Sequence, residues 1–156
     1  MHSTMHPLVE RLQLTPHPEG GFYREVYRSA QTVTSSQTEA PRQALTHIYF
    51  LLLEGQVSRF HRVLHDEVWH HYDGAPLKLL RWNEQQITEQ RIGPGESDFC
   101  STIIGGEFQA AESCGAFTLV GCTVAPGFDF ADFSFADDRQ WLTLPESLRQ
   151  RYQRFR

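Results

Sequence analysis

One segment near the middle of the chain concentrates the side chains that can carry chemistry. Residues 55–74 read GQVSRFHRVLHDEVWHHYDG, a run rich in histidine that also contains a glutamate. If this segment forms a hairpin, Glu67, Trp69 and His71 alternate onto one face, and His61 reaches that face from the preceding strand. An imidazole and a carboxyl group in one pocket suit acid–base catalysis near neutral pH. We therefore expect His61 and Glu67 to line a pocket as its catalytic residues.

Five further residues are candidates for binding a ligand in that pocket. Trp69 can stack on a flat or sugar-like ligand, although an ordinary core position is the alternative. Arg24 can bind a phosphate or carboxylate through two parallel hydrogen bonds, and a surface ion pair is its alternative role. His71 and Gln109 can hydrogen-bond to the ligand, and Ser58 would place a hydroxyl group inside the pocket.

The composition limits the class of protein. A length of 156 residues predicts one domain, residues 1–156, and 40% hydrophobic residues are enough for a real core. The net charge of −5, with scattered Lys and Arg, argues against a nucleic-acid partner. Cys100, Cys114 and Cys122 form no CxxC pair, which indicates reduced thiols. No secretory signal is visible, and the longest apolar run, residues 48–53, is too short for a bilayer, so we expect a cytoplasmic protein without a membrane partner.

The pattern of apolar residues and turns predicts an all-β protein with short helices only at the two ends. The first helix is expected at about residues 5–14, capped by Ser3 or Thr4, and the last begins at Pro145. Residues 31–41 are polar and are expected to form a mobile loop or lid. A small barrel fits best because it leaves few exposed strand edges. The expected strands are residues 22–28, 45–53, 57–63, 67–72, 77–82, 86–92, 101–104, 108–112 and 116–124.

The strand expected at residues 45–53 is almost wholly apolar, so both of its faces should be buried. One face should fill the interior of the domain. The other face must be covered by a second layer of structure or by another subunit. This strand therefore gives a first indication of a homodimer.

The spacing around His61 resembles a known family motif. The first cupin motif reads G-x5-H-x-H-x3–4-E-x6-G, and the chain has Gly55, His61, Glu67 and Gly74 at those spacings, with Val63 in place of the second histidine. Together with residues 17–29 (HPEGGFYREVYRS) and 119–133 (LVGCTVAPGFDFADF), this segment is similar to the single-domain, RmlC-like cupins of the domain-of-unknown-function type. The resemblance implies a double-stranded β-helix, or jelly-roll barrel, that binds a small-molecule ligand in its mouth and forms a homodimer.

The resemblance also raises the question of a metal ion. Many cupins bind a divalent metal through two histidines and a glutamate of the first motif and a histidine of the second. Here Val63 occupies the second ligand position, and Gln109 falls where the last histidine should be. Only His61 and Glu67 remain, whereas a transition metal requires three or four donors. We therefore expect either no cofactor or a weakly bound divalent metal at His61 and Glu67.

Three functions remain open from the sequence. The first is an enzyme that isomerises or epimerises a sugar- or nucleotide-like metabolite, by analogy with cupin epimerases, with His61 as base and Glu67 as its orienting group or acid. The second is a metabolite-binding module without catalysis. The third is a metal-dependent lyase or dioxygenase that uses His61, Glu67 and a substitute ligand.

Overall fold

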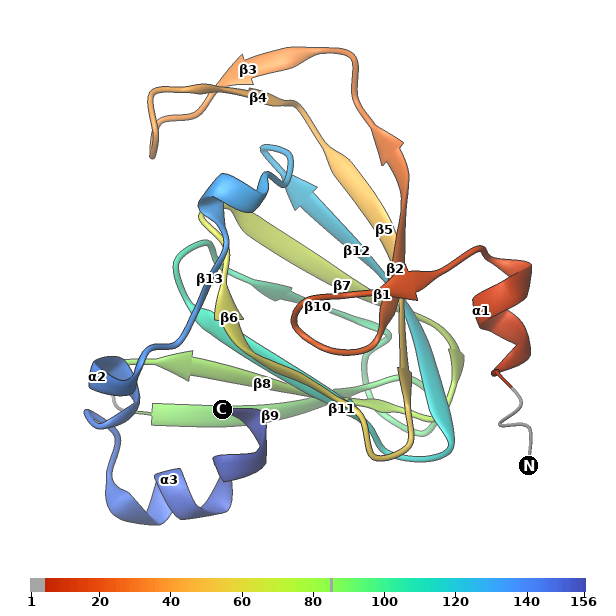
Figure 1. Ribbon diagram of the computed structural model, residues 1–156, viewed down its shortest axis with the longest axis vertical. Coiled ribbons are helices and arrows are strands. Elements are labelled where there is room, and N and C mark those ends of the chain that lie inside the picture. Colours follow the sequence, from red (N-terminus) through yellow and green to blue (C-terminus); the bar gives the residue numbers. More distant parts are fainter. Residues whose placement is uncertain (1–4, 85) are drawn as a thin grey trace.

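Two antiparallel sheets form the body of the protein (Figure 1). The structure, a computed structural model, describes residues 5–84 and 86–156. The larger sheet contains, in spatial order, β1 (Thr15–Pro16), β2 (Phe22–Arg28), β5 (Thr46–Leu53), β12 (Phe117–Ala125), β7 (Asp66–Gly74) and β10 (Cys100–Ile103). The smaller sheet contains β13 (Ser134–Phe135), β6 (Val57–Arg62), β11 (Phe108–Ser113), β8 (Leu77–Asn83) and β9 (Gln86–Ile92).

The main hydrophobic core lies between these two sheets. Phe50 of β5 and Trp69 of β7 meet edge to face at 5.9 Å, and both are fully buried. Leu79 of β8 and Ala111 of β11 complete the same cluster from the opposite sheet. Because side chains alternate along each strand, every second residue contributes to this core. The arrangement confirms the all-β jelly-roll fold expected from the sequence.

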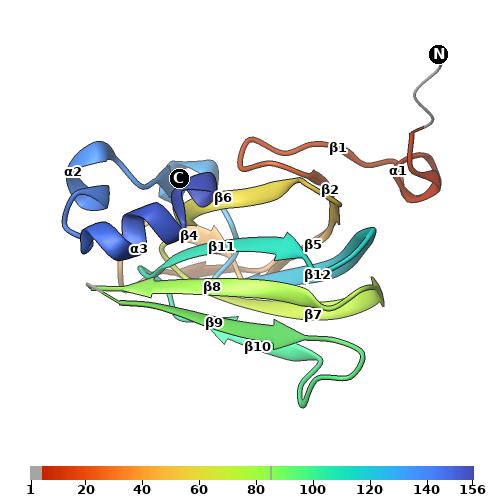
Figure 2. The same ribbon diagram turned by 90° about the horizontal axis from the view of Figure 1, so that it is seen from below.

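Short helices cover the outer faces of the two sheets and lie at opposite ends of the molecule (Figure 2). Helix α1 (Pro7–Arg11) brings Val9 against Leu51 and Leu119, so a second layer covers this part of β5. On the smaller sheet, Trp141 of α2 (Asp138–Trp141) packs near Phe60, and α3 (Glu146–Arg151) follows. In the described part of the chain, no helix combines the length and apolar character needed to cross a membrane.

The structure corrects two of the local predictions made from the sequence. The first helix is shorter than residues 5–14 because it begins after His6, whose Nδ1 accepts a hydrogen bond from the Leu8 amide at 3.2 Å. The expected caps, Ser3 and Thr4, lie outside the described residues. The segment expected as a loop or lid contains β3 (Thr32–Thr34) and the first residue of β4 (Pro41–Gln43), and these two strands pair as a hairpin above the barrel in Figure 1.

The core makes a direct prediction about stability. Leu52 is fully buried between the sheets, whereas Leu142 is 63% exposed. We expect Leu52→Ala to lower the free energy of unfolding by about 2–5 kcal/mol, because it removes apolar contacts and leaves a cavity. Urea denaturation would measure this change. The matched control, Leu142→Ala, should have little effect, and equal losses for the two variants would contradict this description of the core.

Candidate functional site

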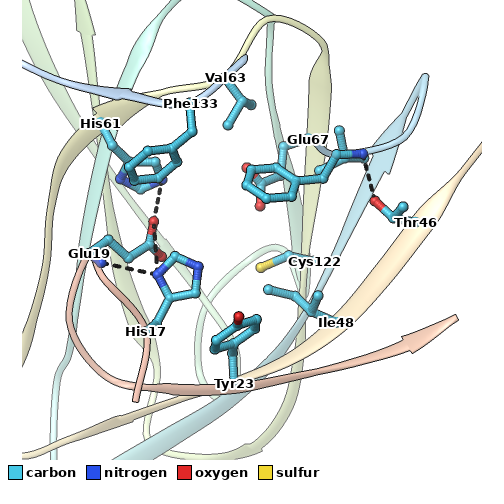
Figure 3. Close-up of a pocket in the computed structure, with 12 residues that line it drawn as sticks. His17, Glu19, Tyr23, Thr46, Ile48, His61, Val63, Glu67, Cys122 and Phe133 are labelled. Carbon is cyan, nitrogen blue, oxygen red and sulfur yellow. Dashed lines mark hydrogen bonds and ion pairs between the residues drawn. The ribbon is translucent and has the colours of Figure 1, made fainter. Parts of the chain in front are cut away.

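A cavity opens at one end of the space between the sheets, and its walls combine acidic, histidine and aromatic side chains (Figure 3). It encloses about 420 Å³ of atom-free space, part of which lies in the open mouth. Its lining residues are His17, Glu19, Tyr23, Thr46, Ile48, His61, Val63, Glu67, Cys122, Val124, Phe128 and Phe133.

The turn between β1 and β2 carries Glu19 into the cavity. The carbonyl oxygen of Glu19 accepts a hydrogen bond of 2.8 Å from the Arg59 amide, which docks the turn on β6. Gly20 follows with φ of +112°, and a Cβ atom there would lie 2.0 Å from the Val57 carbonyl oxygen. Only glycine allows both this backbone angle and this close approach. The glycine therefore allows the preceding carboxyl group to reach the barrel interior.

A bulge in β6 turns His61 toward the same cavity. His61 pairs with Gln109, but Ser58 pairs with Ala111, so β6 contains one more residue than β11 between these two pairs. The extra residue breaks the normal alternation, and Ser58 and His61 are both buried. Such bulges redirect side chains near functional sites.

Glu19 and His61 form a buried ion pair, shown as a dashed line in Figure 3. Glu19 Oε2 lies 2.6 Å from His61 Nε2, and the two side chains are only 7% and 2% exposed. His61 Nδ1 donates to the Arg59 carbonyl oxygen at 2.7 Å, so both ring nitrogens are engaged.

The electrostatics of this pair favour an imidazolium and a carboxylate. Burial alone would lower the pKa of His61, but the negative charge and hydrogen bond of Glu19 outweigh burial and leave that pKa raised. Burial alone would raise the pKa of Glu19, but the charge of His61 leaves it lowered. Glu19 is therefore held ionised by a positively charged partner.

Glu67 is the second carboxyl group of the cavity, and a chain of two hydrogen bonds orients it. The indole nitrogen of Trp69 donates to Gln109 Oε1 at 2.7 Å, and Gln109 Nε2 donates to Glu67 Oε1 at 2.7 Å. An indole N–H can only donate, so it fixes which end of the Gln109 amide faces Glu67. Glu67 Oε1 is thus an acceptor, and a proton on this carboxyl group belongs on Oε2.

The environment of Glu67 differs sharply from that of Glu19. Burial, followed by repulsion from the Glu19 carboxylate, raises the pKa of Glu67 to about 7. Burial also raises the pKa of the neighbouring Cys122 thiol well above its usual range, so Cys122 is a neutral part of the wall. The cavity thus contains one ionised carboxylate and one carboxyl group that exchanges its proton near neutral pH.

His17 and Tyr23 extend the wall beside Glu19. His17 Nδ1 accepts a hydrogen bond from the Glu19 amide at 3.0 Å, so the ring proton of a neutral His17 lies on Nε2. Burial lowers the pKa of His17 and keeps it uncharged. Tyr23 packs edge-on against His17, with ring centroids 4.4 Å apart.

The segment after β12 supplies the aromatic part of the mouth. The backbone amide of Phe128 donates a hydrogen bond to Thr46 Oγ1 at 2.9 Å. The ring of Phe133 stacks on the ring of His61, with 5.3 Å between the ring centroids. Between Phe128 and Phe133 lies η1 (Phe130–Asp132), where Asp132 accepts two hydrogen bonds from Arg42, at 2.7 and 2.9 Å. The β3–β4 hairpin and this aromatic segment are therefore tied together.

The structure brings only some of the expected site residues to the cavity. His61 and Glu67 line it, but His61 pairs directly with Glu19 and not with Glu67. Trp69 and Gln109 lie behind the wall and reach the cavity only through Glu67. Ser58 is fully buried, and its hydroxyl group has no hydrogen-bond partner among the described residues.

His71 and Arg24 lie outside the cavity wall. His71 bonds through Nε2 to the Ala75 carbonyl oxygen at 2.9 Å, at the other end of β7. Arg24 lies over the ring of Tyr49, with its Cζ atom 5.8 Å from the ring centroid. For both residues, the structure gives contacts within the fold and no contact with the cavity.

Sequence reasoning missed the partner of His61. Glu19 lies in a segment that the pattern identified only as a turn, because its two glycines dominate the local signal. His17 and Tyr23 lie in the same family-like stretch without having been given a role. The available signal was the placement of a histidine and a glutamate directly before two glycines and a strand.

The donor set does not fit a transition-metal ion. Both nitrogens of His61 are engaged, Val63 offers no donor, and Gln109 is committed to Trp69 and Glu67. Within residues 5–84 and 86–156, no group of three or more His, Cys, Asp and Glu side chains is arranged to hold a metal.

A double-stranded β-helix with a polar cavity at its mouth defines the cupin class of protein. A sequence profile of the cupin superfamily (DUF985) matches residues 6–136, and the chain therefore belongs to this family. The cavity residues from His17 to Phe133 all fall within the matched region.

Several relatives share nearly the whole chain. Uncharacterized protein YML079W of Saccharomyces cerevisiae is 28% identical over 92% of this chain and 82% of its own. Protein SO0799 of Shewanella oneidensis is 32% identical, with a TM-score of 0.83 over 95% of this chain and 94% of that chain. A hypothetical protein from Leishmania major is also 32% identical, with a TM-score of 0.79 over 94% and 91%. Oxalate decarboxylase from Bacillus subtilis shares the fold alone, at 15% identity and a TM-score of 0.58 over 88% of this chain and 34% of that enzyme.

The raised pKa of Glu67 predicts a pH-dependent stability. Between its ordinary value of 4.5 and about 7, the folded protein holds this proton more firmly than the unfolded chain does. The free energy of unfolding should therefore fall as the pH rises through this window, by on the order of 3 kcal/mol for this group. Glu67→Gln mimics the protonated form, so the variant should not lose this stability as the pH rises. The free energy of unfolding of the variant, minus that of the wild type, should therefore grow with pH up to about pH 7.

Urea denaturation of both proteins across this pH range would check the prediction. Glu54→Gln, which changes an exposed glutamate outside the cavity, is the matched control and should follow the wild-type curve. Parallel curves for wild type and Glu67→Gln would contradict the raised pKa.

Proposed function

We propose that the cavity is the active site of an acid–base enzyme that isomerises or epimerises a small polar metabolite. The single observation that supports this proposal most strongly is the contrast between two carboxyl groups in one cavity. Glu19 is held ionised by His61, whereas the pKa of Glu67 is about 7. Environments that separate two pKa values in this way mark the base and the acid of many enzymes.

The proposed step transfers one proton in each direction. The Glu19 carboxylate removes a proton from a substrate carbon, and the electron pair remains on the substrate as an enolate-like anion. The Glu67 carboxyl group then donates its Oε2 proton to that anion, which completes the rearrangement and leaves Glu67 ionised. Exchange with solvent returns both groups to their starting states. His61 acts as a positioning residue, because both of its nitrogens are already engaged.

This assignment changes the role expected for His61 from the sequence. A histidine base needs a nitrogen lone pair that is free to face the substrate. Here Nε2 faces Glu19 and Nδ1 faces a carbonyl oxygen, so the proposal gives the base role to Glu19. Glu67 keeps the proton-transfer role expected from the sequence.

A metabolite-binding module without catalysis is the second candidate. It is favoured by the closed hydrogen-bond pattern of His61 and by the apolar side chains Ile48, Val63 and Val124 in the wall. The same cavity would then hold a ligand without moving a proton. The third candidate, a metal-dependent lyase or dioxygenase, is the least supported because the donor set does not fit a metal.

Solvent deuterium exchange would test the catalytic proposal. The protein would be incubated in D2O with pooled small metabolites, and mass spectrometry would detect deuterium at a carbon position. We expect Glu19→Gln and Glu67→Gln to lower the exchange rate by about 10²–10⁴-fold, because each removes a group that transfers a proton.

Glu54→Gln is the control and should exchange at the wild-type rate. A metabolite that stabilises the protein in a thermal shift assay but never exchanges would favour the binding module instead. Unchanged exchange in both cavity variants would remove the two glutamates from the mechanism.

We also propose that the chain forms a homodimer in the cytoplasm. The outer face of the larger sheet beside α1 is hollowed, and Val26, Tyr49 and Tyr72 lie on it. Val26 is 37% exposed and Tyr72 is 46% exposed, so α1 leaves part of this apolar face uncovered. The three free cysteines support a reducing compartment.

Light scattering would test the dimer. We expect a mass of twice 18.0 kDa at micromolar concentration. Val26→Glu should shift the protein toward the monomer, because it places a charge in the proposed apolar contact. A wild-type protein that is monomeric under these conditions would contradict the proposal.

A further inference from the structure

The cavity wall contains acidic side chains but no unpaired positive charge among the described residues. Among the described residues that line it, none is a lysine or arginine, whereas two are glutamates. The positive charge of His61 is already matched by Glu19 at 2.6 Å, and His17 is neutral. An anionic ligand would therefore enter without a compensating charge, at a large electrostatic cost in a buried site.

The aromatic side chains of the wall favour the opposite charge. Tyr23 lines the cavity from β2, and Phe133 lines it from the segment after β12 (Figure 3). Phe128 of the same segment is also part of the lining. Phe133 already stacks on the His61 ring at 5.3 Å, with an angle of 21° between the two planes. The wall thus holds one organic cation, the imidazolium, against an aromatic face. The face of an aromatic ring has a negative electrostatic potential because of the ring quadrupole, and it therefore attracts cations.

We propose that the cavity binds a small organic cation, such as a protonated or quaternary amine, between its aromatic wall and the carboxyl group of Glu67. This inference rests on the proposed function only in that the cavity binds a ligand. The sequence alone suggested a sugar- or nucleotide-like metabolite. The inference excludes those metabolites that would place a phosphate or carboxylate group in the cavity. An amino sugar or a small aminoalcohol belongs to the proposed class of organic cations.

Binding of a cation should be coupled to the proton on Glu67. Four groups face this carboxyl group from the surrounding elements, namely Glu19 from the β1–β2 turn, His61 from β6, Gln109 from β11 and Cys122 from β12. A cation next to Glu67 stabilises its ionised form, so binding should release a proton. Affinity for a cation should therefore increase as the pH rises through about 7, and affinity for a neutral ligand should not.

Three probes of nearly the same shape would test the inference. Choline carries a positive charge, 3,3-dimethylbutan-1-ol is its neutral analogue, and 3,3-dimethylbutanoate is the anion. Calorimetry at about pH 8 would measure the affinity for each probe. We expect choline to bind most tightly, the alcohol less tightly and the carboxylate least tightly. Between about pH 5.5 and pH 8 the affinity for choline should increase by roughly tenfold or more, while that for the alcohol stays constant.

Matched variants separate charge from shape. Glu67→Gln should remove the pH dependence of choline binding, whereas Glu54→Gln should behave as wild type. The inference is overturned if the carboxylate binds as tightly as choline, if choline is no better than the alcohol at pH 8, or if none of the probes binds. The deuterium-exchange experiment decides the catalytic proposal separately, since it does not depend on these probes.

Discussion

The ion pair between Glu19 and His61 is the interaction on which the rest of the site depends. It joins the β1–β2 turn to β6, two segments that are distant in the sequence, inside the barrel. An unpaired charge at either position would be strongly destabilising in so buried a place. The pair therefore requires three local features at once: a glycine with positive φ, a bulge and a docked turn. It also determines the environment of Glu67, because the fixed negative charge of Glu19 helps to keep the second carboxyl group protonated.

The sequence predicted the architecture well because the strand signals are local. Alternating apolar residues and Gly–Pro turns located the strands of both sheets, such as residues 22–28 and 86–92. The β3–β4 hairpin was missed because its strands are short and polar and contribute nothing to the core. Its position depends instead on hydrogen bonds to segments far away in the chain, such as those between Arg42 and Asp132 and between Ser35 and His65.

The candidate site was predicted only in part, for a related reason. His61 and Glu67 were found because their spacing matches a motif within one segment. Glu19 was not found, since its role arises only when a distant turn folds against β6. Trp69 and Gln109 were expected to contact the ligand, but the fold uses them to orient Glu67 from behind. Sequence spacing can show that a polar residue lies near a site. It does not show whether that residue lines the cavity or lies behind the wall and orients a residue that does.

The bulge in β6 has a consequence for how this family can vary. Removing one residue between Ser58 and His61 would restore regular pairing with β11, but it would rotate His61 to the opposite face of the sheet. Glu19 would then lose its counter-charge without any change in the identity of a cavity residue. Homologues with the same chemistry should therefore tolerate many substitutions in this strand but no change in its length.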